Sequence, residues 1–327
     1  MSHDSDHFRT ILVPVDGSKL AEQALPLAIA IAERSRGKVK LVLVHRQIHH
    51  ALLESTGEFA RTELAIHQSE RNYLKDLLGT VRKRLGRAVS SATLKGPVAP
   101  ALAQYVREAG ADLVVMTTHG QGGVRRAWLG SIADQLIRSV EVPVLLVRAA
   151  EKGAAEAPAE FGEILVPLDG SPLAEAAVEP AAALARLWDG EISLVQVVSP
   201  VALYADQPLA FPLGFDNRFT EMRRETAADY VRDIAEHLRE AGVKASGVAV
   251  LGGSVAETLL DLADPERVGL LVIATHGRGG ARRLVLGSVA DKLVRAAEVP
   301  VLVVRPAGRR ARRKSGGTNV PAGAGIA

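Results

Sequence analysis

The chain of 327 residues contains no cysteine. This absence excludes disulfide bonds, thiolate metal sites, iron–sulfur clusters and a cysteine nucleophile. Aromatic residues make up only 4% of the sequence, so the core must consist of Val, Ile, Leu and Ala. Such a core favours buried parallel strands under alanine-rich helices over an aromatic β-sandwich.

Long apolar runs are also missing, because none approaches the ~20 residues that span a bilayer. The polar start MSHDSDHFRT differs from a signal peptide, so we expect a cytoplasmic protein without a membrane partner. The net charge is +3, and segment 309–314 alone carries five cations. Subtracting these five leaves −2 for the rest of the chain, so no nucleic-acid partner is expected.

The sequence repeats itself. Residues 118–148 and 275–305 are identical at 21 of 31 positions without a gap, and ILVPVDGS (11–18) matches ILVPLDGS (164–171). Two copies of one domain follow from this repeat. The expected organisation is a first domain at 1–148, a linker at 149–162, a second domain at 163–305 and a disordered basic tail at 306–327.

Each copy alternates strand and helix patterns. In the first copy the predicted strands are Thr10–Val15, Val39–Val44, Ala88–Leu94, Leu113–Thr117 and Val142–Val147, and the predicted helices are Leu20–Arg34, Glu63–Leu85, Val98–Glu108 and Ser131–Val140. Apolar strands separated by helices indicate a parallel sheet that is covered on both faces. The expected fold class is α/β, with two tandem doubly wound five-stranded parallel-sheet domains of the Rossmann-like type.

The last strand of each copy is apolar and is expected at a sheet edge, at Val144–Val147 and Val301–Val304. Open apolar edges are usually covered. We therefore expect the two copies to pair through these strands, which leaves another surface for a homodimer.

Two features follow predicted strands at their carboxyl ends, where ligands bind in doubly wound sheets. Asp16 and its counterpart Asp169 directly follow the first strand of each copy, where a carboxylate suits ribose hydroxyls. The alternative is helix capping, because Asp-Gly-Ser before a helix is common capping chemistry.

The second feature is a glycine-rich loop that leads into a helix, from His119 to Ser131 and again from His276 to Ser288. Glycines let backbone N–H groups approach an anion, and the helix N-terminus adds partial positive charge. The structural alternative is a tight turn with Ser as the N-cap. Because each loop is paired with an Asp after the first strand, the pattern favours a nucleotide site.

These segments resemble the universal stress protein family over about residues 8–148 and 161–305. The family motif reads Gly, two residues, Gly, nine residues, Gly and then Ser or Thr. Its last elements match Gly120 with Gly130-Ser131, and Gly277 with Gly287-Ser288. Its first Gly is replaced by Thr117 and Ala274. The closing VEVPVLLVR and AEVPVLVVR resemble the family's final strand.

The resemblance implies ATP, with Mg²⁺ as its companion, in a fold similar to the adenine-nucleotide alpha hydrolases. Asp16 and Asp169 would then contact ribose, and the residues matching the motif, Gly120, Gly130, Ser131, Gly277, Gly287 and Ser288, would hold phosphates. Val197 at the end of the second strand fits an adenine-packing role, and Arg46 is interpreted as its counterpart in the first copy.

Other polar residues leave alternatives open. Arg125, Arg126, Arg282 and Arg283 would either reach phosphates or lie in solvent. Asp134 and Asp291 fall in the first turn of a helix, where an acid complements the helix dipole and a Mg²⁺ ion is the alternative. His49, His50 and His67 lack the spacing of a ligand set, so a solvated loop is favoured over a metal cluster and no metal site is predicted.

The function expected from these patterns is ATP-dependent regulation of the stress response. No positioned general base is recognisable, so no catalytic residue is predicted and any ATPase activity would be slow. One alternative is an interaction module of the same fold that has lost nucleotide binding, motivated by Thr117, Ala274 and Arg46. An adenylyl transferase is disfavoured, because VPVDGS and VPLDGS lack the Ser-Gly-Gly-type first loop of such enzymes.

Overall fold

Each half of the chain forms a doubly wound parallel sheet, which confirms the predicted fold class. The computed structural model describes residues 7–45, 57–118, 129–148, 161–200, 202–204, 212–275 and 286–306. In the first half the strand order is β3-β2-β1-β4-β5, and in the second it is β10-β7-β6-β11-β12. The strands are β1 (Thr10–Val15), β2 (Lys38–His45), β3 (Val89–Lys95), β4 (Leu113–Thr117), β5 (Val144–Val147), β6 (Glu163–Pro167), β7 (Glu191–Val198), β10 (Lys244–Leu251), β11 (Val268–Ala274) and β12 (Val301–Val304).

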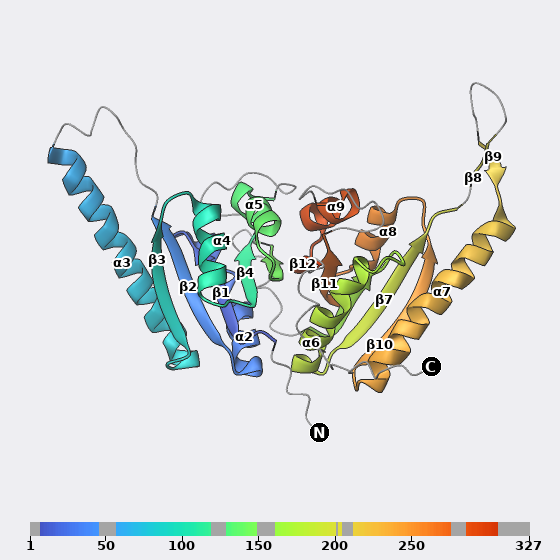
Figure 1. Ribbon diagram of the computed structural model, residues 1–327, viewed down its shortest axis with the longest axis horizontal. Helices are drawn as coiled ribbons and strands as arrows, with labels where there is room; N and C mark the ends of the chain where they lie inside the picture. Colours follow the sequence, from blue (N-terminus) through green and yellow to red (C-terminus); the bar gives the residue numbers. More distant parts are fainter. Residues whose placement is uncertain are drawn as a thin grey trace, which may run out of the picture.

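Helices cover both faces of the sheet, because the buried strands carry apolar side chains on both sides. One face packs against α2 (Leu25–Ser35), α3 (Gly57–Leu85), α6 (Val178–Trp188) and α7 (Asn217–Glu240). The other face packs against α4 (Val98–Glu108), α5 (Ser131–Ser139), α8 (Val255–Leu262) and α9 (Ser288–Ala296). In Figure 1, α3 and α7 run along the two outer sides of the molecule, and α5 and α9 face each other near its centre.

The two halves share one ten-stranded sheet, because β5 and β12 pair in antiparallel orientation. Val301, Leu302 and Val303 lie opposite Leu146, Leu145 and Val144. The predicted pairing of the last strands is therefore confirmed. It covers the two apolar edges that each half would otherwise expose.

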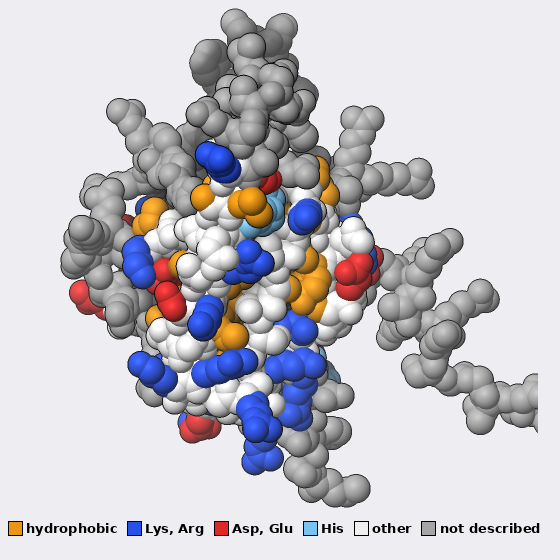
Figure 2. Space-filling model, turned by 90° about the vertical axis from the view of Figure 1, so that its left-hand side faces the viewer, with side chains coloured by type: hydrophobic (Ala, Val, Ile, Leu, Met, Phe, Trp, Pro, Cys, Tyr) orange, Lys and Arg blue, Asp and Glu red, His pale blue; other side chains and the backbone are white. Residues whose placement is uncertain are grey.

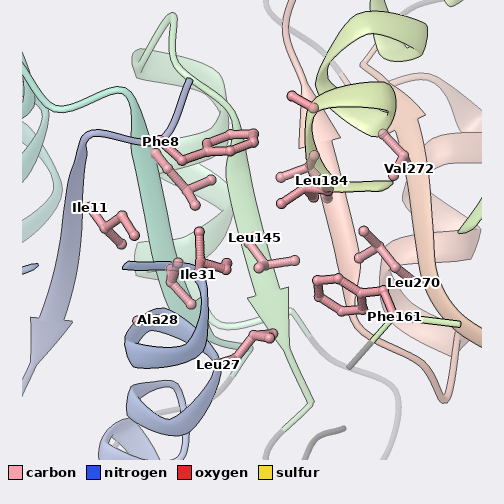
Figure 3. Close-up of a cluster of buried hydrophobic side chains, with 14 of the residues drawn as sticks. Phe8, Ile11, Leu27, Ala28, Ile31, Leu145, Phe161, Leu184, Leu270 and Val272 are labelled. Atoms are coloured by element: carbon pink, nitrogen blue, oxygen red, sulfur yellow. The ribbon is translucent and has the colours of Figure 1, made fainter. Parts of the chain in front are cut away.

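The apolar layer on the α2 and α6 side is continuous across this junction. Figure 3 shows side chains of both halves meeting there, with Leu145 of the first half facing Phe161 and Leu270 of the second. Trp188 packs against Phe161 with ring centroids 4.8 Å apart, and the Arg34 guanidinium lies 4.8 Å from the Trp188 ring. The helices α2 and α6 are thus joined by apolar and cation–π contacts.

Two arginines join the two halves on the opposite face of the sheet. Arg148 donates to the carbonyls of Ala296 and Ala297, at 3.3 and 2.8 Å. Arg305 reciprocates by donating to the carbonyls of Arg138 and Val140, at 3.0 and 3.3 Å. Because these carbonyls lie at the C-terminal ends of α5 and α9, the arginines satisfy acceptors that the helices leave open.

One predicted helix is divided in the structure, and the ends of several other predicted elements differ by one to six residues. The helix expected at Leu20–Arg34 is divided into α1 (Lys19–Glu22) and α2, because Pro26 lies in the first turn of α2 and cannot continue a preceding helix. The equivalent segment of the second half begins as a 3₁₀-helix at Ala174–Ala177 before α6. A two-stranded antiparallel sheet of β8 (Ala202–Tyr204) and β9 (Pro212–Phe215) precedes α7 and was not predicted.

Within the described part of the chain, no helix is both long enough and apolar enough to cross a membrane. The longest helix, α3, is amphipathic and ends in basic residues. Figure 2 views the molecule from the α3 side and shows Lys and Arg side chains gathered over its lower part.

The junction generates a stability prediction. Leu145 is fully buried and faces Leu302 between β5 and β12, so Leu145→Ala leaves a cavity in the shared core. We expect the free energy of unfolding to fall by about 2–5 kcal/mol, measured by urea unfolding. The control is Leu64→Ala, because the Leu64 side chain is 65% exposed. An equal loss of stability in both variants would contradict a packed junction.

Candidate functional site

The candidate site of each half lies at the carboxyl ends of the first and fourth strands of its sheet. In the first half β1 pairs with β2 on one side and with β4 on the other. In the second half β6 likewise lies between β7 and β11. These are the points where the strand order reverses, and ligands of doubly wound sheets bind there.

Asp16 and Asp169 organise the turn that follows the first strand. Asp16 is exposed, and its Oδ1 accepts hydrogen bonds from the Ser18 N–H at 3.0 Å and from the Ser18 hydroxyl at 2.6 Å. Ser18 in turn accepts the Ala21 N–H at 3.1 Å and is the N-cap of α1. The capping role considered for Asp16 therefore belongs to Ser18, and Asp16 orients it.

The second half repeats this turn. Asp169 Oδ1 accepts the Ser171 N–H at 3.0 Å, and the Ser171 hydroxyl accepts the Ala174 N–H at 3.2 Å. Gly17 and Gly170 adopt φ angles of 86° and 79°, in the region that favours glycine. The Asp-Gly-Ser sequence thus places a carboxylate at the same point of each sheet.

A backbone hydrogen bond joins the two ends of each glycine-rich loop. The Gly130 N–H donates to the Thr118 carbonyl at 2.8 Å, and the Gly287 N–H donates to the Thr275 carbonyl at 3.0 Å. Gly120 and Gly277 lie outside the described residues, as do Arg125, Arg126, Arg282 and Arg283. The structure therefore places the ends of both loops, directly beside the first turns of α5 and α9.

Ser131 and Ser288 are the first residues of α5 and α9, and both are exposed. The N-cap role, considered as the structural alternative for these serines, was wrong, because Gly130 and Gly287 occupy the N-cap positions. Among the residues that the structure describes, no side chain caps either helix start. The N–H groups of the first turn, which have no acceptor inside the helix, are thus available for an anion.

The residues that replace the first glycine of the motif are held in the sheet. Thr117 ends β4 and is 6% exposed, and Ala274 ends β11 and packs against the core on the α6 side. The additional methyl group of Ala274 is accommodated by that core.

Val197 has a different counterpart from the one inferred above. Val195 pairs with Pro167, and Val42 pairs with Pro14, which is the equivalent proline of the repeat. Val44 therefore corresponds to Val197, and the comparison of Val197 with Arg46 was wrong by two residues. Both valines are partly buried and pack against the same apolar cluster. Arg46 itself lies outside the described residues.

Asp134 and Asp291 form bidentate ion pairs one turn further along their helices. Asp134 accepts from Arg138 at 2.9 and 2.8 Å, and Asp291 accepts from Arg295 at 2.8 and 2.9 Å. These hydrogen bonds raise the pKa of both arginines. Because each pair engages both carboxylate oxygens, the structure favours ion pairing and dipole complementation over a Mg²⁺ site at these residues.

A cluster of ionisable side chains was missed. His45 ends β2 and is 1% exposed. Its Nδ1 lies 2.9 Å from a Glu70 oxygen, and its Nε2 lies 2.8 Å from a Glu63 oxygen. The His67 ring stacks on the His45 ring with centroids 3.8 Å apart. The available signal was the spacing of Glu63, His67 and Glu70, which places them on one face of a helix.

Burial lowers the pKa of His45, but the hydrogen bonds and charges of Glu63 and Glu70 outweigh this effect and raise it above its ordinary value. His67 is 28% exposed and lies 4.0 Å from Glu63 and 3.7 Å from Glu70. The solvated setting assumed for His67 was therefore wrong. His49 and His50 lie outside the described residues.

Comparison with known proteins identifies related chains. The model of the universal stress protein family matches residues 7–148 and 160–305. A curated universal stress protein of Mycobacterium tuberculosis is 28% identical over 232 residues, which cover 71% of this chain and 72% of that protein. One from Mycolicibacterium smegmatis is 28% identical over 305 residues, which cover 90% of this chain and 97% of that protein.

Solved structures show the same fold. The crystal structure of a universal stress protein from Archaeoglobus fulgidus has a TM-score of 0.63 to this chain at 16% identity. The match covers 91% of this chain and 98% of that one. The tandem arrangement of the two halves therefore has a precedent among solved folds.

The positive φ angle of Gly17 leads to a prediction about the free energy of unfolding. Gly17→Ala forces a side chain into the φ = 86° conformation, so we expect stability to fall by about 1 kcal/mol. Gly79→Ala is the control, because Gly79 lies within α3 and an added Cβ meets open space. That variant should gain about 0.5–1 kcal/mol of stability. Urea unfolding of both variants measures the difference, and a stabilised Gly17→Ala protein would refute the constrained turn.

Proposed function

Because the chain belongs to the universal stress protein family, we propose that it binds ATP in each half and regulates the stress response according to its nucleotide state. The proposal rests on two features that lie together in each half, at the switch point where the strand order of the sheet reverses. These features are a carboxylate after the first strand and a helix start after the fourth. Asp16 follows β1, and the uncapped start of α5 follows the neighbouring β4. Asp169 and α9 repeat the pair beside β6 and β11.

Each group suits one part of a nucleotide. The carboxylates of Asp16 and Asp169 accept hydrogen bonds from ribose hydroxyls. The first turns of α5 and α9, with Ser131 and Ser288, donate to phosphate oxygens, and the loop glycines Gly120, Gly130, Gly277 and Gly287 let the backbone approach them. Val197 and its counterpart Val44 offer an apolar surface for adenine.

The charge of the site also suits the negatively charged phosphates of ATP. The helix starts bring partial positive charge to the place where the phosphates would lie. When bound with the nucleotide, Mg²⁺ would neutralise phosphate charge. No described residue stands out as a general base, so the proposal is regulation by binding, with at most slow hydrolysis. A cytoplasmic location and a homodimer belong to the same proposal.

The second candidate function is an interaction module of the same fold without nucleotide binding. It is favoured by Thr117, which is buried where the family motif begins with glycine. Under this alternative the loops would serve protein contacts, and neither half would bind ATP.

Release of bound nucleotide tests the proposal. The purified chain is denatured, and the supernatant is separated by ion exchange with detection at a nucleotide-absorbing wavelength. We expect about two adenine nucleotides per chain, one for each switch point. The absence of nucleotide, together with no thermal shift on addition of ATP and Mg²⁺, would overturn the proposal and support the interaction module.

Variants assign the nucleotide to each half. Asp16→Ala and Asp169→Ala should each lower the amount of retained nucleotide to about half, because each removes a ribose acceptor from one site. Asp229→Ala is the matched control, since Asp229 is an exposed surface residue of α7 that pairs with Arg232. Equal loss in all three variants would show that the effect does not arise at the switch points.

A further inference from the structure

We propose that His45, Glu63 and His67 form a binding site for a divalent transition metal, of the class of Zn²⁺, in the first half of the molecule only. The ligand atoms of these three side chains all lie within 4.8 Å of one another. They come from the end of β2 and from α3, so a bound metal would join the strand to the helix.

The separations are close to those that a metal requires. Zn²⁺ holds nitrogen and oxygen ligands at about 2.0–2.2 Å in tetrahedral geometry, so neighbouring ligand atoms lie roughly 3.3–3.5 Å apart. Here Glu63 Oε1 lies 2.8 Å from His45 Nε2 and 4.0 Å from His67 Nε2. Binding requires the partly exposed Glu63 and His67 side chains to rotate, with His67 leaving its stack on His45, so that all three separations, none above 4.8 Å, reach this range.

Glu70 is not one of the three ligands but binds the other ring nitrogen of His45. Its carboxylate accepts the His45 Nδ1 hydrogen bond at 2.9 Å, which leaves Nε2 directed toward Glu63. A ligating histidine characteristically donates its second nitrogen to a carboxylate in this way, and the carboxylate fixes both tautomer and ring orientation. Because His45 is 1% exposed, its ring is also held by packing.

The second half shows that the fold itself does not need this cluster. The register of the paired strands makes Val198 the counterpart of His45. Val198 is buried and packs with Ala227 of α7 and Ala249 of β10. The same point of the fold is thus filled by small apolar side chains in one half and by two histidines and two glutamates in the other.

The donor set selects the class of metal. Two imidazole nitrogens and one carboxylate suit Zn²⁺ and Co²⁺, with a fourth position for water, whereas Mg²⁺ prefers oxygen ligands. The site lies on the α3 face of the sheet, whereas the neighbouring Val44, assigned to adenine, packs with the cluster on the α4 and α5 face. Metal binding here is consequently separate from any Mg²⁺ that accompanies a nucleotide.

Cobalt titration tests the site directly. The full chain is freed of metal by chelation and of nucleotide by washing, and Co²⁺ is added while its visible ligand-field absorption is followed. We expect about one tightly bound Co²⁺ per chain with the intense absorption of tetrahedral coordination, which Zn²⁺ displaces and Mg²⁺ does not. The absence of such absorption in the native chain would overturn the proposal, whatever the outcome for ATP.

Three variants locate the ion. His67→Gln removes a partly exposed ligand and should weaken Co²⁺ binding at least tenfold. Glu70→Gln retains all three ligands but loses the carboxylate behind His45, so it should weaken binding by about 10–100-fold. The control is His237→Gln, because His237 is an exposed histidine of α7 in the second half. Native affinity in both His67→Gln and Glu70→Gln, or loss of binding in His237→Gln, would place the ion elsewhere and refute the site.

Discussion

The antiparallel pairing of β5 with β12 is the constraint on which the rest of the structure depends. It turns two five-stranded sheets into one sheet, and it lets the apolar layers of both halves merge. It also brings the C-terminal ends of α5 and α9 within reach of Arg305 and Arg148. The helices that begin beside the two candidate sites are consequently anchored to one another, so both sites belong to one continuous body.

Much of the fold could be predicted because its signals are local. Continuous apolar runs located the strands, and β1, α4 and β4 begin and end where the sequence predicted. The repeat then implied that the last strands are equivalent, and covering their open edges led to their pairing. The division of the first helix was missed because the prediction followed apolar spacing and not the proline at position 26. The small sheet of β8 and β9 was missed because apolar periodicity does not encode it.

The candidate site shows the same limit. Asp16, Asp169 and the loop glycines were found because carboxyl ends of neighbouring parallel strands meet at one edge. The counterpart of Val197 was misplaced by two residues, since only strand pairing fixes the register between copies. The cluster around His45 was missed for a related reason. Its partners on α3 are distant in sequence, and only the packing of helix on strand brings them together.

The symmetry of the scaffold makes a buried ionisable difference between the two halves informative. Both halves share the Asp-Gly-Ser turn, the hydrogen bond that joins the ends of the loop and the uncapped helix start. At the end of the second strand they diverge, with His45 in one half and Val198 in the other. Placing two partly exposed carboxylates against the buried His45 costs desolvation that packing Val198 against alanine does not, although His45 pairs with both. The second half places Val198 at this point of the same fold, so the fold does not require the cluster, and the proposed metal binding gives the cluster a role.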